Sequence, residues 1–186
     1  MVRSFESHAT CAGEILMRAT TCIVFLLSIL MFPTLVAAQQ ADADSHSATV
    51  FCDFNDTQEV SVRYSTAVST SKDEPRNGKV WLPGGSAMTL FTGVGLTLNS
   101  SAIPAGAYSV YVIPNKKDWT LIVNKNITPG AAYDEKQDVA RSPMEIGEVD
   151  SPAKQLQVSF AHSAPKQCSI RLYYGKTGAF ADFKEQ

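Results

Sequence analysis

Residues with catalytic chemistry are few in this sequence, and none stands at a spacing typical of a reaction centre. Gly84-Gly85-Ser86-Ala87-Met88 approaches the Gly-x-Ser-x-Gly turn that exposes a nucleophilic serine, but Met88 stands where the closing glycine belongs. Beyond the first 38 residues the histidines are His46 and His162, and neither has a catalytic or ligand partner at an informative spacing. We predict that Ser86 lies in an ordinary turn between strands, and we predict no catalytic residue.

An enzyme is the alternative if separate loops bring polar groups together. Arg76, Asp134 and His162 around one cleft would be such a set, and sequence spacing does not exclude it. Asp134 belongs to an acidic stretch that ends at Asp138, which is more typical of a solvated face than of an acid–base pair. Convergence of these groups in a pocket with perturbed pKa values would favour the enzyme.

Metal ligands are equally sparse. Asp42, Asp44 and His46 could chelate a cation, but this polar, aperiodic stretch would lose conformational entropy on binding. There is no Cys-x-x-Cys motif, and no histidine stands near Cys52 or Cys168 in the sequence. We therefore predict no metal site and no cofactor, and we interpret residues 39–47 as a flexible tail.

Four aromatic residues have two alternative roles. Packing in the core of a sheet structure is the first interpretation of Trp81, Tyr108, Tyr111 and Trp119. If two of them were exposed side by side, they would instead form a surface that binds a glycan or another small ligand. Exposed, adjacent aromatic rings would thus favour a binding protein over an enzyme.

The first 38 residues have the pattern of an export signal. Residues 22–36 form an uncharged apolar run that is too short to span a bilayer, with Arg18 before it and Ala37-Ala38 after it. We predict cleavage after Ala38, with Met17 as the natural start; a permanent membrane anchor is the alternative, and Pro33 argues against it. Cleavage removes 38 of the 186 residues and leaves 148, exported to the periplasm or outside the cell.

The composition excludes some partners. The net charge is −2, charged residues make up 18% of the chain and no block of lysine and arginine occurs, so we predict no nucleic-acid partner. No membrane span is expected once the leader is removed. Sequons occur at Asn55, Asn99 and Asn126, and they matter only in a eukaryotic secretory pathway.

Two cysteines remain after the predicted cleavage. Cys52 and Cys168 each belong to an alternating run, so both thiols are expected to point inward from strands. An even pair in an oxidising compartment suggests a disulfide. Two unpaired buried thiols are the alternative.

Short alternating runs dominate the rest of the chain. Residues 59–64 and 155–160 alternate strictly, and 107–113 and 119–125 form a hairpin with apolar residues on both faces, which predicts a central position. The only helical candidate is the stretch from Ala131 to Ala140. Further β-rich runs occur at 48–54, 79–82, 88–92, 95–99 and 168–174. We predict a single all-β domain over residues 48–186, an antiparallel β-sandwich or jelly-roll-like fold of roughly nine strands with at most one short helix.

The same residues resemble a known family. The blocks PAGAYSVYVIP and WTLIVNK, together with YDEKQDVAR, LQVSF and CSIRLYYG, are similar to the family called domain of unknown function 2911, over residues 48–183. The resemblance implies an exported, β-rich protein and no established catalytic residue or ligand. This chain has Thr66-Ala67 where members commonly have Arg-Pro. It has Leu82 and then Gly84 to Ala87 where they have an arginine and Gly-Ala-Asn-Glu, so a charged site there would be lost or altered.

These observations favour a non-catalytic exported module. We expect it to bind a ligand or to make structural contacts in the cell envelope or outside the cell. A glycan, a small ligand or an envelope protein would be the partner. An enzyme such as a hydrolase, with a site assembled from separate loops, is the alternative.

Overall fold

The computed structural model describes residues 46–54, 57–68 and 74–186. The predicted leader and its cleavage site, Asp42, Asp44 and the sequon at Asn55 lie outside these residues. No helical turn within the described ranges has the length and apolar character of a membrane span.

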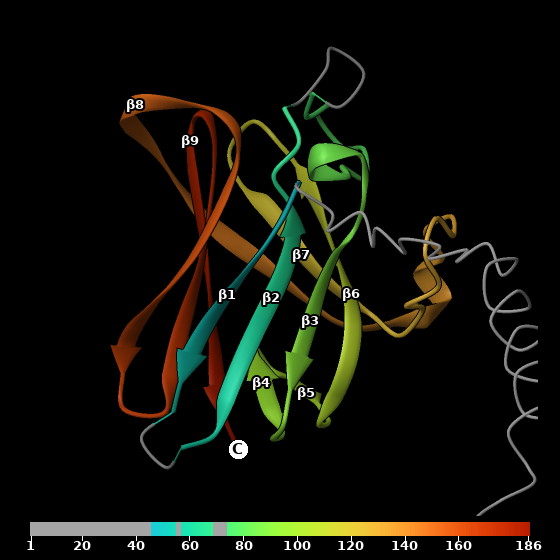
Figure 1. Cartoon of the computed structure of the whole chain (residues 1–186), viewed down its shortest axis with the longest axis vertical. Helices are drawn as coiled ribbons and strands as arrows, with labels where there is room; N and C mark the ends of the chain where they lie inside the picture. Colours follow the sequence, from blue (N-terminus) through green and yellow to red (C-terminus); the bar gives the residue numbers. More distant parts are fainter. Residues whose placement is uncertain (1–45, 55–56, 69–73) are drawn as a thin grey trace, which may run out of the picture. The chain divides into compact units, whose positions relative to one another are not determined.

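Antiparallel strands make up most of the described chain, which confirms the predicted all-β class (Figure 1). The nine strands follow the spatial order β1-β2-β3-β6-β7-β8-β9-β4-β5. Their bounds are β1 (Ser47–Asp53), β2 (Glu59–Ser65), β3 (Met88–Thr92), β4 (Leu96–Leu98), β5 (Ser101–Ile103), β6 (Gly106–Pro114), β7 (Trp119–Asn124), β8 (Asp138–Ala164) and β9 (Gln167–Glu185).

Strand β9 doubles back on itself. Fifteen residues of straight strand would separate Gln167 from Asp182 by about 50 Å, since a strand rises roughly 3.3 Å per residue. Yet Gln167 Nε2 donates a hydrogen bond to Asp182 Oδ2 over 2.9 Å. The reversal lies around Gly175, whose φ of +57° is a left-handed conformation that favours glycine. Figure 1 shows the two arms of β9, residues 167–174 and 177–185, side by side.

Strand β8 joins the two halves of the fold. One half consists of β1, β2, β3, β6 and β7, and the other consists of β9, β4 and β5. Its residues 138–144 pair with β7, residues 145–148 pair with the second arm of β9, and residues 157–164 pair with the first arm. The register shifts between Glu148 and Gln157, where β8 bends. β4 pairs with the end of β9 and also with β5.

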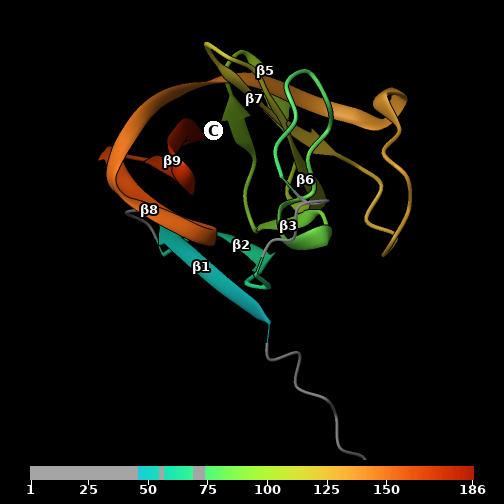
Figure 2. The same ribbon diagram turned by 90° about the horizontal axis from the view of Figure 1, so that it is seen from above.

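The core lies between the two halves. Figure 2 shows β9 and the later part of β8 on the opposite side from β3 and β6, while the first part of β8 runs beside β7. Val62 of β2, Val112 of β6 and Leu172 of β9 are fully buried in one cluster. The Trp81 ring packs edge-on against Trp119, with ring centres 5.4 Å apart. Alternation puts one face of strands such as β3 in the core and the other outside, whereas the central strands β6 and β7 are buried on both faces.

The predicted hairpin is present, but the predicted helix and one predicted strand are much shorter than expected. The 107–113 and 119–125 runs become β6 and β7, each with a strand on both sides, so the predicted central hairpin is confirmed. The helical candidate from Ala131 to Ala140 contains only a 3₁₀ turn, Glu135–Gln137, and its end already belongs to β8. The predicted strand at 79–82 is reduced to one bridge, between Trp81 and Val112.

A disulfide joins Cys52 of β1 to Cys168 of β9, as predicted. Both residues are buried, and they are 116 positions apart in the sequence. A bridge over so long a loop restricts the unfolded chain strongly, and the chain-entropy model values it at about 5 kcal/mol. The bond therefore ties the first strand of the described chain to the last.

Replacing both cysteines by alanine, Cys52→Ala with Cys168→Ala, is expected to lower the free energy of unfolding by about 2–5 kcal/mol. Urea unfolding of the oxidised protein and the double variant, followed by circular dichroism, measures this loss. The reduced parent protein serves as the control. An unchanged midpoint, or free thiols in the denatured and unreduced parent, would contradict the stabilising role of the bond.

Candidate functional site

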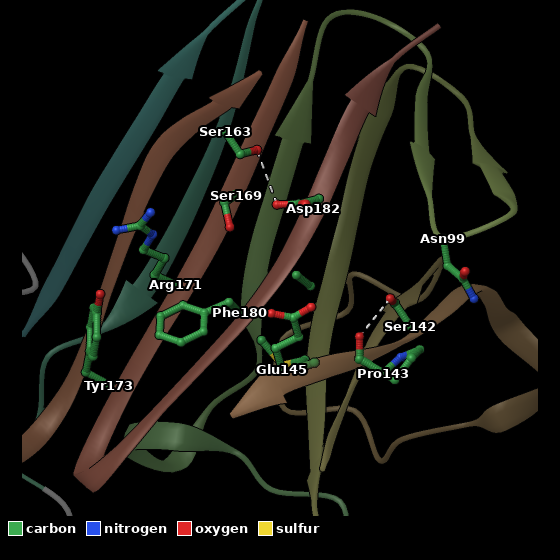
Figure 3. Close-up of a pocket in the computed structure, with 12 residues that line it drawn as sticks. Asn99, Ser142, Pro143, Glu145, Ser163, Ser169, Arg171, Tyr173, Phe180 and Asp182 are labelled. Atoms are coloured by element: carbon green, nitrogen blue, oxygen red, sulfur yellow. Dashed lines mark hydrogen bonds between the residues drawn. The ribbon is translucent and has the colours of Figure 1, made fainter. Parts of the chain in front are cut away.

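A groove of about 730 Å³ lies against β9, on the face that points away from the core (Figure 3). Alternation creates this face: Ile170 and Leu172 are buried, while Arg171 between them is partly exposed. The groove is lined by Asn99, Ser142, Pro143, Met144, Glu145, Ser163, Ser169, Arg171, Tyr173, Phe180, Ala181 and Asp182.

One end of the groove is aromatic. The rings of Tyr173 and Phe180 are partly exposed and meet at 73°, with centres 6.1 Å apart. The guanidinium carbon of Arg171 lies 5.8 Å from the centre of the Phe180 ring, a cation–π distance. A side chain on Gly178 would come within 3.0 Å of Phe180 and 3.3 Å of Tyr173, so this glycine makes room for both rings.

The other end of the groove is polar. Asp182 accepts hydrogen bonds from Ser163 Oγ over 3.3 Å and from Gln167 Nε2 over 2.9 Å. Gln167 Nε2 also contacts Ser163 Oγ at 3.1 Å. These contacts hold the Asp182 carboxylate in one orientation at the rim.

The opposite wall adds hydrogen-bonding groups. Asn99 has a φ of +54° in the turn between β4 and β5 and is exposed, and Glu145 is exposed on β8. Within the described residues Arg171 makes no ion pair, so its donors are available to a ligand. The groove thus offers a ring surface, one guanidinium and two carboxylates.

A second polar cluster surrounds Tyr133. Its hydroxyl donates to Asp138 Oδ2 over 2.7 Å and accepts from Arg141 Nη2 over 2.6 Å. Arg141 also pairs with Asp138 and with Glu135, at 2.7 and 2.9 Å. The buried Asn124 donates to Asp138 Oδ1 over 2.7 Å. These mutual contacts fasten the loop between β7 and β8.

The phenol of Tyr133 loses its proton only at high pH. Burial, followed by the hydrogen bond to Asp138 and its charge, raises the pKa of Tyr133 to about 12. The hydroxyl therefore stays protonated and keeps donating to Asp138 at neutral pH. The cluster stabilises the chain before β8, because Asp138 and Glu135 pair with Arg141 and Asp138 also accepts from Tyr133.

The aromatic residues singled out in the sequence are all buried. Trp81, Tyr108 and Trp119 belong to the core cluster, as expected. Tyr111 is also buried, but on the other face of β6, where its ring packs against that of Tyr133. The adjacent, partly exposed rings are instead Tyr173 and Phe180, to which sequence reasoning gave no binding role.

The loop residues considered for an enzyme lie in different surroundings. Arg76 lines a smaller hollow of about 370 Å³ with Glu74 and Lys79. Asp134 caps the 3₁₀ turn by accepting from the backbone N–H of Lys136, 3.0 Å away. Among the described contacts none links these two residues to each other or to His162.

His162 lies beside the disulfide. Its Nε2 is 3.9 Å from Cys52 Sγ, although 110 residues separate them. His162 pairs across the β8–β9 hairpin with Cys168, and this pairing brings it there. The sequence could have revealed this contact, because the short turn at Ala164-Pro165-Lys166 between two alternating runs places residues 162 and 168 opposite each other.

The two segments that depart from the resembled family lie together. A side chain on Gly84 would meet Ser65 Oγ at 2.7 Å, and Ser65 directly precedes Thr66-Ala67. Leu82 is 38% exposed at the same place and lines the smaller hollow. Loss or alteration of a charged site here stays a prediction.

Removing the Tyr133 hydroxyl, Tyr133→Phe, is expected to cost about 0.5–1 kcal/mol of stability at pH 8, because a partly exposed hydrogen bond is lost. The pKa is higher in the folded state, so the parent's advantage is complete below pH 10 and disappears as the pH rises through about 12. Urea unfolding at pH 8 and pH 11 measures it, with Tyr64→Phe as the control. A difference that grows with pH would contradict the assignment.

Comparison with known proteins agrees with the resemblance seen in the sequence. The sequence profile of the family described as "Protein of unknown function (DUF2911)" matches residues 45–182. Comparison with curated proteins and with solved structures found no match. The match covers the nine-stranded fold up to Asp182, including all the lining residues of the groove on β9. The chain therefore belongs to the DUF2911 family.

Proposed function

We propose that this protein is an exported, non-catalytic binding module, and that the groove on β9 holds a carbohydrate. The adjacent Tyr173 and Phe180 rings, with Arg171 against Phe180, are the observation that carries the proposal. The volume of the groove, about 730 Å³, lies in the range of small-ligand sites.

The chemistry of the groove suits a sugar. The C–H face of a pyranose ring packs on aromatic rings, and its hydroxyls need both donors and acceptors around the edge. Tyr173 and Phe180 offer the ring surface, Arg171 offers donors, and Asp182 and Glu145 offer acceptors. The groove is also open to solvent along its rim, where these groups are exposed, so a longer chain could continue out of it.

The geometry argues for binding rather than turnover. The Asp182 carboxylate accepts hydrogen bonds on both oxygens and is held by its neighbours. The groove serines, Ser142, Ser163 and Ser169, are not accompanied by a histidine or lysine among the lining residues. Among the lining residues no serine therefore has the histidine or lysine that usually activates a serine nucleophile, which favours binding over hydrolysis of that type.

Two features support export. The leader pattern ends at Ala38, and the Cys52–Cys168 disulfide belongs to proteins of oxidising compartments. The periplasm or the outside of the cell, where structural polysaccharides lie, is the place that we propose for this module.

Binding is tested with a glycan array and thermal-shift screen of the processed protein. We expect a soluble oligosaccharide to bind, Phe180→Ala to weaken binding by about 10-fold or more, and Arg171→Gln to weaken it less. Phe51→Ala is the matched control, because Phe51 is an aromatic residue 58% exposed on β1, away from the groove. Equal affinity in Phe180→Ala and the parent, or no carbohydrate bound, would contradict the proposal.

Export is tested by expressing the whole sequence in a bacterium and sequencing the N-terminus of the secreted product. We expect it to begin at Gln39, because Val36 and Ala38 occupy the positions that the signal peptidase reads. Replacing Ala38 by a large residue, Ala38→Trp, should leave the leader attached. A product that keeps residues 22–36 in the parent would contradict the predicted cleavage.

A further inference from the structure

Three metal-ligating side chains from three strands meet at one place. Cys52 comes from β1, His162 from β8 and Cys168 from β9, and their ligand atoms all lie within 4.8 Å of one another. The cysteines are buried, while His162 is exposed. The three residues are not adjacent in the sequence, and the pairing of the strands brings them together.

The chemistry of this set depends on the state of the cysteines. As a disulfide, the two sulfurs are uncharged and poor ligands. A dithiol reductant supplies two electrons and two protons and becomes a disulfide itself, which leaves Cys52 and Cys168 as thiols. Two thiolates and one imidazole then form a donor set that Zn²⁺ prefers.

The geometry requires little rearrangement. Zinc binds sulfur at about 2.3 Å and imidazole nitrogen at about 2.0 Å, so ligand atoms around a tetrahedral zinc ion stand about 3.5–3.8 Å apart. His162 Nε2 is already 3.9 Å from Cys52 Sγ. Once their bond opens, the two sulfurs need to separate by only about 1.5–2 Å to reach that spacing.

We propose that Cys52, His162 and Cys168 bind one Zn²⁺ when the disulfide is reduced. Binding displaces the two thiol protons and forms two zinc–sulfur bonds and one zinc–nitrogen bond. The protein supplies three ligands, and a water molecule would be the fourth. After loss of the zinc, exchange with an oxidised dithiol restores the Cys52–Cys168 disulfide, and the oxidised dithiol takes up the two electrons and two protons.

Strands β1 and β9 would then be joined in one of two ways that cannot occur together. Either the disulfide or the metal joins Cys52 to Cys168, so zinc maintains the connection in a reducing environment. This function is separate from the groove, whose lining does not include these three residues.

The test uses Co²⁺ as an optical probe of the zinc site. The processed protein is reduced with a phosphine, which binds metals weakly, and titrated with Co²⁺. We expect one Co²⁺ per chain, with thiolate charge-transfer absorption and the visible bands of tetrahedral cobalt, and displacement by Zn²⁺. The oxidised protein should show none of these bands.

Variants separate this site from adventitious binding. His162→Ala should weaken binding at least about 10-fold, since even a group that only hydrogen-bonds to a metal ligand costs that much. His46→Ala, which alters another exposed histidine, should leave affinity unchanged. Octahedral cobalt spectra, equal affinity in His162→Ala and the parent, or binding by the oxidised protein would overturn the proposal.

A second measurement covers the case in which reduction unfolds the protein. Metal binding then appears as folding, so Zn²⁺ should restore the near-ultraviolet circular dichroism and raise the melting temperature of the reduced parent. The same addition should have no such effect on His162→Ala. Recovery of both proteins alike would count against a site at His162.

Discussion

The reversal of β9 at Gly175 is the constraint on which the rest of the structure depends. It places residues 167–174 and 177–185 side by side. Because side chains alternate between the two faces of a strand, neighbouring residues then point inward and outward in turn. Inward residues such as Ile170 and Leu172 complete the core. Outward residues form the groove, whose aromatic end combines Tyr173 from one arm with Phe180 from the other.

The same strand pairing connects stability to chemistry at the edge of the fold. Cys168 faces inward from β9 and meets Cys52, which ties the first strand of the described chain to the last. The turn into β9 brings His162 opposite Cys168, so the bond that stabilises the domain has an exposed imidazole beside it. The buried rings of Trp81 and Trp119 pack edge-on in the core, whereas the adjacent rings of Tyr173 and Phe180 are partly exposed.

Much of the fold could be predicted from the sequence, because strict alternation marks the strands that have one face in the core. The run at 88–92 became β3 with the same bounds, and both inward cysteines were found. The stretches 138–148 and 177–185 were missed as strands. Their outward positions carry charges such as Glu145 and Lys184, and glycines interrupt them at 147 and 178, so their periodicity is weak. The groove could not be predicted, because Arg171 and Phe180 meet only after the reversal at Gly175.

The location of the ligand tests the account most directly. Backbone amide NMR shifts of the labelled protein, recorded while the strongest oligosaccharide from the array is added, report where the ligand contacts the chain. The account predicts the largest changes at Arg171, Tyr173 and Phe180 and small changes around the hollow at residues 74–85. Changes centred on residues 74–85, with β9 unaffected, would contradict it.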